Sequence, residues 1–127
     1  MHLFFCATIS FKSLPKILLI EDEASIRAVL KDILLDQKEL KLEVEAARDG
    51  AEGLQKLEND YFDVAFCDIK MPKMDGMEVL QKAKAKGINT VFIMVSAHGT
   101  TEMAVDATKA GAYDFLQKPP DLNRLLI

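Results

Sequence analysis

The sequence predicts one α/β domain built on a five-stranded, doubly wound parallel sheet. Short apolar runs alternate five times with segments of helical periodicity, a pattern that predicts parallel strands joined by right-handed crossover helices. The run at 64–67 is apolar without alternation, as in a strand that helices cover on both faces. Half of the 127 residues are hydrophobic and 28% are charged, which is typical of a single soluble domain.

The five predicted strands differ in their expected burial. The runs at 16–20, 63–68 and 90–96 are continuous and apolar, which indicates buried strands, with 16–20 near the centre. Segment 40–46 alternates apolar and charged residues, so we expect a half-exposed edge strand there. Residues 112–116 form the last predicted strand.

Four helices are predicted between these strands, and the start of a fifth follows them. They cover 24–37, 50–58, 76–86 and 101–110, and the last begins after Asp121. In the first helix the residues expected to face inward are Ile26, Val29, Leu30, Ile33 and Leu34. Helix 101–110 has few apolar residues to bury, which predicts a weakly anchored, mobile element.

Polar groups stand at or just beyond the ends of four predicted strands. Glu21 and Asp22 follow the first strand, Asp68 ends the third, Ser96 ends the fourth, and Lys118 follows the fifth. Each has an ordinary alternative explanation: charges at a helix N-terminus, a plain strand end, or a solvated loop lysine. Because the carboxyl ends of parallel strands share one edge, where ligands bind in open α/β sheets, we expect the five groups to converge.

Three carboxylates at one edge require a cation. Two carboxylates 4 Å apart repel by roughly 4 kcal/mol at an effective dielectric constant near 20. A hard divalent ion with oxygen ligands relieves this repulsion, and Mg²⁺ shared between carboxylates and phosphate oxygens is the common solution. Aspartate can act as a nucleophile and carry an acyl phosphate. The residues therefore indicate a Mg²⁺-assisted phosphoryl acceptor, with Asp68 as the acceptor.

The chain resembles the receiver domain of two-component response regulators. The resemblance is carried by ILLIEDE (17–23), DVAFCDIKMPKMDGMEVL (63–80), MVSAHG (94–99) and YDFLQKP (113–119). It covers nearly everything from residue 16 onward, and the tract 97–119 is most similar to receivers of the nitrogen-regulator class. It implies a flavodoxin-like fold with strand order 2-1-3-4-5, whose last helix is cut short here.

The resemblance also implies a role for each site residue. Asp68 would be the phospho-acceptor, and Lys118 would contact the phosphoryl oxygens. The Mg²⁺ ligands would be Glu21, Asp22, Asp68 and the backbone carbonyl of Lys70. Ser96 and Phe115 would be the switch pair that moves after phosphorylation, shifting the surface around residues 100–127. The bond between Lys118 and Pro119 would be cis.

Three departures from the family pattern bear on these roles. Glu21 stands where many members have aspartate, so it could hold the metal through water. Ser96 replaces the commoner threonine and lacks its methyl group. Pro120 occupies a position where an aromatic residue is frequent.

The resemblance implies a sensor histidine kinase as phosphoryl donor and an output domain outside this chain, which for this class is an AAA+ transcription activator. Association with a second copy of the chain, as a homodimer, is also expected. The formal net charge is −4, and the sequence has no basic stripe of the kind that nucleic-acid-binding domains carry. No apolar run is long enough to cross a membrane. Two cysteines distant in sequence favour a reducing compartment, so we expect a cytoplasmic domain at 16–127, with 1–15 as an extension outside it.

Two other readings of the same residues stay open. An aspartyl-phosphate phosphatase or transferase would need a second carboxylate two residues after the nucleophile, but that position is Lys70. A degenerate receiver would bind partners without phosphate, although every site position holds a competent group. Lys70 and His98 should border the site, and we hypothesise that they set the lifetime of the acyl phosphate.

Overall fold

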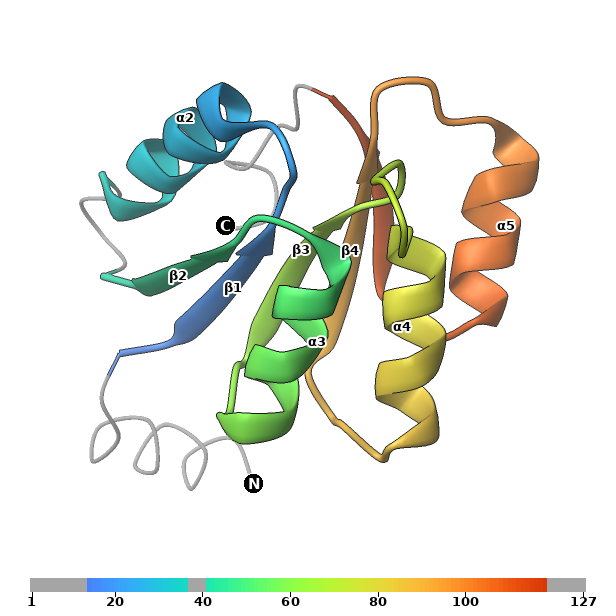
Figure 1. Ribbon diagram of the computed structural model, residues 1–127. Coiled ribbons are helices and arrows are strands. Elements are labelled where there is room, and N and C mark those ends of the chain that lie inside the picture. The colour runs from blue at the N-terminus through green and yellow to red at the C-terminus, as the bar shows by residue number, and fades with distance from the viewer. Residues whose placement is uncertain (1–13, 37–40, 119–127) are drawn as a thin grey trace, which may run out of the picture.

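The computed structural model describes residues 14–36 and 41–118 (Figure 1). Within them the chain forms, in order, β1 (Lys16–Ile20), α2 (Ala24–Leu35), β2 (Glu43–Ala47), α3 (Gly50–Asn59), β3 (Val64–Asp68), α4 (Gly76–Ala85), β4 (Val91–Ser96), α5 (Thr101–Lys109) and β5 (Asp114–Gln117). Three predictions lie outside the described residues: most of the extension at 1–15, the helix after Asp121, and the cis bond between Lys118 and Pro119.

The strands form one parallel sheet in the order β2-β1-β3-β4-β5. This confirms the predicted fold class and strand order, and it places β2 at an edge, as its alternating sequence indicated. The register pairs Ile20 with Cys67 in β3, and Asp68 with Val95 in β4. The carboxyl ends of β1, β3 and β4 therefore lie together along one edge of the sheet.

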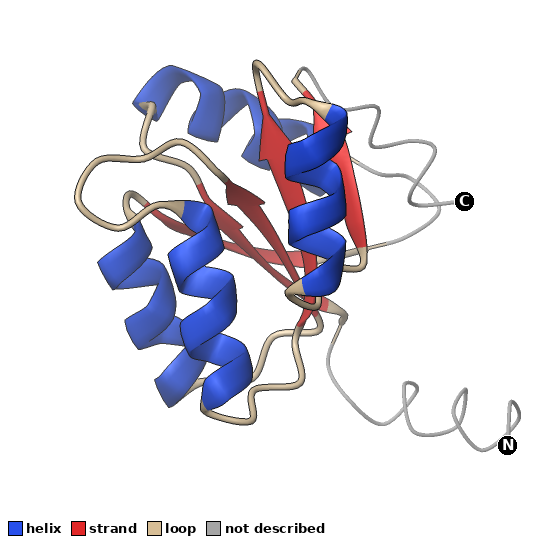
Figure 2. Cartoon of the chain, turned by 90° about the vertical axis from the view of Figure 1, so that its right-hand side faces the viewer, coloured by secondary structure: helices blue, strands red, loops and turns tan. Residues whose placement is uncertain are grey.

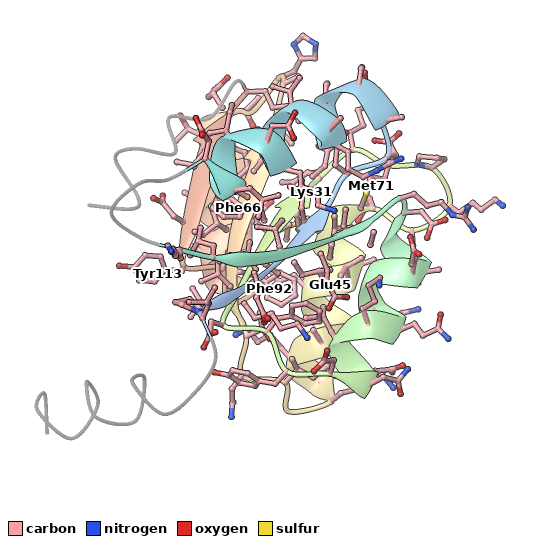
Figure 3. The ribbon with its side chains drawn as sticks, turned by 90° about the vertical axis from the view of Figure 1, so that its left-hand side faces the viewer. Lys31, Glu45, Phe66, Met71, Phe92 and Tyr113 are labelled. Atoms are coloured by element: carbon pink, nitrogen blue, oxygen red, sulfur yellow. The ribbon has the colours of Figure 1, made fainter. Side chains whose placement is uncertain are left out.

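Helices cover both faces of the sheet (Figures 1 and 2). One core cluster packs α2 against one face, and a larger cluster packs α3, α4 and α5 against the other. Figure 3 shows this division at Phe66, on the side of α2, and at Phe92, on the side of α3 and α4. Because both faces of β3 are covered, the sequence 64–67 is apolar without alternation. No helix in the described chain is long and apolar enough to cross a membrane.

The prediction of which α2 residues face inward is partly wrong. Leu30 and Leu34 are buried, but Val29 and Ile33 are 56% and 41% exposed. They line an apolar groove with Ile26, Ala97 and Lys118. The sheet covers only one side of the wide apolar stripe, because the described part of the chain places no second element against the other side. The helix also ends at Leu35, two residues earlier than predicted.

Three of the four described helices begin with a side-chain cap. The side chains of Asp49, Asp75 and Thr100 accept backbone N–H bonds at the starts of α3, α4 and α5, at 2.8, 2.9 and 3.1 Å. Helix α2 differs, since Glu23 at its N-cap accepts no such bond within the described residues. Contacts other than a side-chain cap must therefore hold the start of α2.

Helix α5 is weakly anchored, as its sequence indicated. Ala107 is its one buried residue, and Met103 and Ala110 pack only partly against the core. The strand after it is shifted relative to the prediction, since β5 covers Asp114–Gln117 rather than 112–116. This shift arises because Gly111 has a φ of 110° and Ala112 turns back to donate to the Ala107 carbonyl, which closes the helix before pairing begins.

Candidate active site

Asp68 is the last residue of β3 and is only 5% exposed. The chain turns sharply after it, and Gly76 at the start of α4 donates its N–H to the Ile69 carbonyl at 2.8 Å. A Cβ atom at Gly76 would lie 2.2 Å from the carbonyl oxygen of Asp68, so only glycine fits there. The close approach of α4 therefore fixes the backbone of Asp68 at the edge of the sheet.

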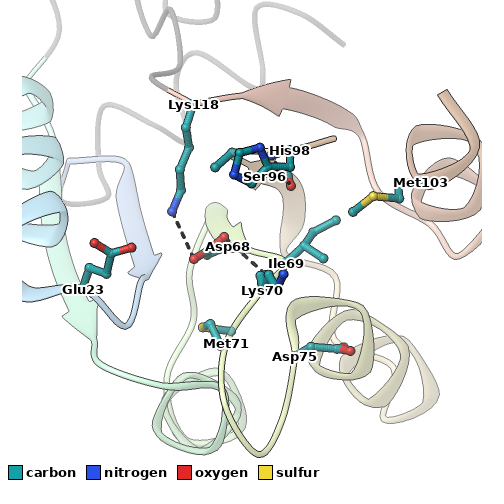
Figure 4. Close-up of a pocket in the computed structure, with 11 residues that line it drawn as sticks. Glu23, Asp68, Ile69, Lys70, Met71, Asp75, Ser96, His98, Met103 and Lys118 are labelled. Atoms are coloured by element: carbon teal, nitrogen blue, oxygen red, sulfur yellow. Dashed lines mark hydrogen bonds and ion pairs between the residues drawn. The ribbon is translucent and has the colours of Figure 1, made fainter. Parts of the chain in front are cut away.

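Lys118 connects two of the carboxylates at this edge. Its Nζ lies 2.8 Å from Oε1 of Glu21 and 3.1 Å from Oδ2 of Asp68; Figure 4 draws the second contact. Its backbone N–H donates to the Ser96 carbonyl at 2.9 Å, which continues the pairing of β5 with β4. Glu21 is 2% exposed and also accepts the N–H of Glu23 through Oε2, at 3.1 Å. The ammonium group is thus held between two buried acids.

The pKa values of these groups reflect burial first and charge second. Burial raises the pKa of Asp68 to about 6, and the negative charge of Glu21 adds to this, while the hydrogen bond from Lys118 opposes it. Burial also acts to lower the pKa of Lys118, but its bonds to Glu21 and Asp68 outweigh burial and raise that pKa. Burial likewise raises the pKa of the Cys67 thiol, in agreement with its interpretation as a core residue and not a nucleophile.

The three acids at this edge form a cluster that could hold a cation. One carboxylate oxygen from each of Glu21, Asp22 and Asp68 lies within 4.8 Å of the others. Lys118 supplies one positive charge to three negative ones, so two negative charges stay uncompensated. Among the described residues the Asp22 carboxylate has no hydrogen-bond partner, and Oδ1 of Asp68 accepts only a long bond of 3.4 Å from the Lys70 N–H. An all-oxygen site with free carboxylate oxygens fits a hard divalent ion such as Mg²⁺.

A hollow of about 700 Å³ opens above Asp68 (Figure 4). Ser96, Lys70, His98 and Lys118 line it with Asp68. Ser96 is 4% exposed, and its Oγ accepts the N–H of His98 at 3.3 Å. Lys70 and His98 are therefore at the mouth, where the sequence indicated. The role of the Lys70 carbonyl as a metal ligand stays a prediction.

Phe115 lies apart from the other site residues. It is half-buried and packs against the larger core cluster without lining the hollow. A Cβ atom at Gly99, in the loop after β4, would lie 2.5 Å from its ring. The same loop is tied to β5, because Nε2 of Gln117 donates to the Gly99 carbonyl at 3.0 Å. Phe115 thus touches the loop that follows Ser96 and carries His98.

Sequence reasoning missed two residues near the acids. Glu23 lines the hollow, and Arg27 donates from Nη1 to the backbone carbonyl of Glu21 at 2.8 Å. The sequence contained one signal for this contact: Arg27 stands one helical turn after Glu23 and can reach back over the start of α2. The direction of its long side chain depends on tertiary structure, which no periodicity reports.

Comparison with known proteins matches residues 17–127 to the response regulator receiver domain. The chain belongs to this family. It is 39% identical to the chemotaxis protein CheY of Listeria monocytogenes over 112 residues, which are 87% of this chain and 92% of CheY. A solved CheY-like receiver domain from Methanospirillum hungatei matches with a TM-score of 0.80 and 38% identity, over 90% of this chain and 89% of that one.

Longer proteins also match this chain over part of their length. The chain is 36% identical to the response regulator protein PilR of Pseudomonas aeruginosa over 113 residues, which are 89% of this chain but 25% of PilR. It is 32% identical to the regulatory protein AtoC of Escherichia coli over 24% of that protein. The chain thus spans about a quarter of these relatives. The matches confirm the predicted resemblance to receivers of the nitrogen-regulator class.

Proposed function

We propose that this receiver is a phosphorylation-controlled switch in which Asp68 accepts a phosphoryl group with the help of Mg²⁺. The observation that carries the proposal is the position of Asp68. It is a buried strand-end carboxylate bonded to Lys118, and two further acids lie within 4.8 Å of it. Family membership agrees with this function.

The proposed reaction needs positioning and charge neutralisation more than covalent help from the protein. An Asp68 carboxylate oxygen forms a bond to phosphorus, while the bond from phosphorus to the donor breaks. The donor is the phosphohistidine of a sensor kinase, or a small acyl phosphate. Lys118, already 3.1 Å from Oδ2, neutralises charge on the phosphoryl oxygens. Mg²⁺ bound by Glu21, Asp22, Asp68 and the Lys70 carbonyl would add a divalent charge at the same oxygens.

We further propose that Ser96 and Phe115 pass the change to the surface around residues 100–127. Ser96 lines the hollow, and Phe115 contacts the loop that follows Ser96. Helix α5, with one buried residue, is the element that can move at the lowest cost in packing. The domain would catalyse only its own phosphorylation and dephosphorylation.

The setting of this switch is inferred from its relatives. The match to PilR, and to the transcriptional regulatory protein ZraR of Klebsiella oxytoca at 33% identity, supports a transcription output, which we assign to an AAA+ activator. The receiver itself would be cytoplasmic, with a sensor histidine kinase as its donor. The match to CheY supports an output on a separate protein as the second candidate. The receiver would occupy 16–127 and leave 1–15 outside it, in line with a family match that begins at residue 17.

The test is the intact mass of the protein after incubation with acetyl phosphate and Mg²⁺. We expect one phosphoryl adduct that disappears with EDTA and in Asp68→Asn. A folded protein that gains no adduct would contradict the switch and favour a receiver that works without phosphate. Rapid turnover of small phosphate esters would favour a phosphatase instead.

A further inference from the structure

The turn between β1 and α2 carries two of the three acids but lacks the support that the other described helices have. No side-chain cap is present at Glu23 within the described residues. The N–H of Glu23 donates to Oε2 of Glu21 at 3.1 Å, so this bond depends on the carboxylate that also pairs with Lys118. A contact from outside the turn must therefore fix the direction in which the Asp22 carboxylate points.

Arg27 supplies that support from the second turn of α2. Its Nη1 donates to the carbonyl oxygen of Glu21 at 2.8 Å and lies 3.4 Å from that of Asp22. The side chain is half-buried, and its backbone N–H is anchored on the Glu23 carbonyl at 2.9 Å. A planar, permanently charged guanidinium group holds carbonyl oxygens in a fixed geometry. The turn is thus fastened to the helix at the two residues that carry the acids.

We propose that Arg27 is a positioning residue for the cation site. By holding the backbone of Glu21 and Asp22, it directs their carboxylates toward Asp68. The inference rests on the proposed Mg²⁺ site, but it concerns a residue that contributes no ligand to that site.

The loss of Arg27 should change the affinity for Mg²⁺ in opposite directions, depending on whether Arg27 acts through its charge or through its support of the turn. A guanidinium group beside a divalent cation repels it, so removal of the charge alone would strengthen Mg²⁺ binding. Removal of the support would weaken it, because the carboxylates would have to be ordered when the ion binds. The sign of the change in Mg²⁺ affinity therefore separates the two effects.

Arg48 offers a matched control. With Asp22, Arg27 and Lys73 it lines a second hollow of about 460 Å³ beside the acids. Among the described residues its guanidinium group has no hydrogen bond or ion pair; only its backbone N–H is bonded, to Glu52. Arg48→Gln therefore removes a nearby positive charge without releasing the turn.

The experiment is a calorimetric titration of the metal-free protein with Mg²⁺, for the wild type, Arg27→Gln, Arg27→Lys and Arg48→Gln. We expect Arg27→Gln to bind Mg²⁺ about tenfold more weakly, which corresponds to 1.4 kcal/mol. Arg27→Lys should fall between it and the wild type, and Arg48→Gln should bind as tightly as the wild type or more tightly. In EDTA, the Glu23 amide hydrogen should exchange at least fivefold faster in Arg27→Gln but not in Arg48→Gln.

Unchanged or tighter Mg²⁺ binding by Arg27→Gln would overturn the inference, and so would an equal loss in Arg48→Gln. If Arg27→Gln fails to fold, Arg27→Lys must show the weaker binding alone. A wild type that binds no Mg²⁺ would contradict the proposed cofactor instead. The Glu23 exchange rate, measured without metal, would then still decide whether Arg27 holds the turn.

Discussion

Asp68 should destabilise the metal-free domain at neutral pH. Burial raises its pKa from the ordinary 3.8 to about 6. Below pH 3.8 the carboxyl is protonated in both the folded and the unfolded chain. Between 3.8 and 6 the folded protein keeps a proton that the unfolded chain releases, so stability falls as the pH rises. At 1.36 kcal/mol per pH unit the full penalty is about 3 kcal/mol, reached above about pH 6.

Replacement of Asp68 by Asn removes this charge from both states. The variant should therefore be more stable than the wild type by up to about 3 kcal/mol near pH 7.5, with little advantage near pH 4. Urea denaturation in EDTA, followed by far-UV circular dichroism at several pH values, measures the difference. If Mg²⁺ binds at the proposed site, its addition should reduce this difference in stability, because the ion would bind the folded wild type and not the unfolded chain.

The control is Asp32→Asn, which removes an exposed carboxylate from α2 and should change stability little at any pH. The reasoning would be refuted if the advantage of Asp68→Asn were the same near pH 4 and near pH 7.5. It would also be refuted if the variant were the less stable protein at neutral pH without metal.

Three further substitutions test packing contacts of the domain, the first two by urea denaturation and the third by NMR. Gly76→Ala should lose about 2–3 kcal/mol, because the new methyl group meets the backbone of Asp68 at 2.2 Å; a loss below 1 kcal/mol would show that α4 can shift. Thr90→Val should lose about 1–2 kcal/mol, since its buried Oγ1 donates to the Phe62 carbonyl at 2.9 Å, and no loss would mean that water replaces the bond. Gly99→Ala should displace the Phe115 ring and change its aromatic NMR signals, which an unaffected spectrum would contradict.

The fold could be predicted from the sequence because a strand that helices cover on both faces is apolar without alternation. The run Val64–Cys67 is apolar throughout, and helical periodicity separates it from its neighbours. The convergence of Asp68, Ser96 and Lys118 followed from parallel pairing alone, since strand ends in register must share an edge.

The remaining features depend on distances that periodicity does not encode. The stripe on α2 identified Val29 and Ile33 as apolar, but only the position of the sheet decides that they are exposed while Leu30 and Leu34 are buried. The pairing of Lys118 with Glu21 and the reach of Arg27 depend on long side chains with several rotamers. Such contacts arise only when strands far apart in sequence come together.

The two helices that border the hollow, α4 and α5, are attached to the sheet with different strength. The start of α4 is tied to the end of β3, because Gly76 donates its N–H to the Ile69 carbonyl at 2.8 Å and its backbone lies directly against that of Asp68. Helix α5, whose Met103 also lines the hollow, is retained by the burial of Ala107. A protein bound to the first turn of α4 would therefore sense almost nothing of an event at Asp68. A protein bound to α5 would sense most of it, so the choice of docking helix decides whether a partner reads the signal or only recognises the domain.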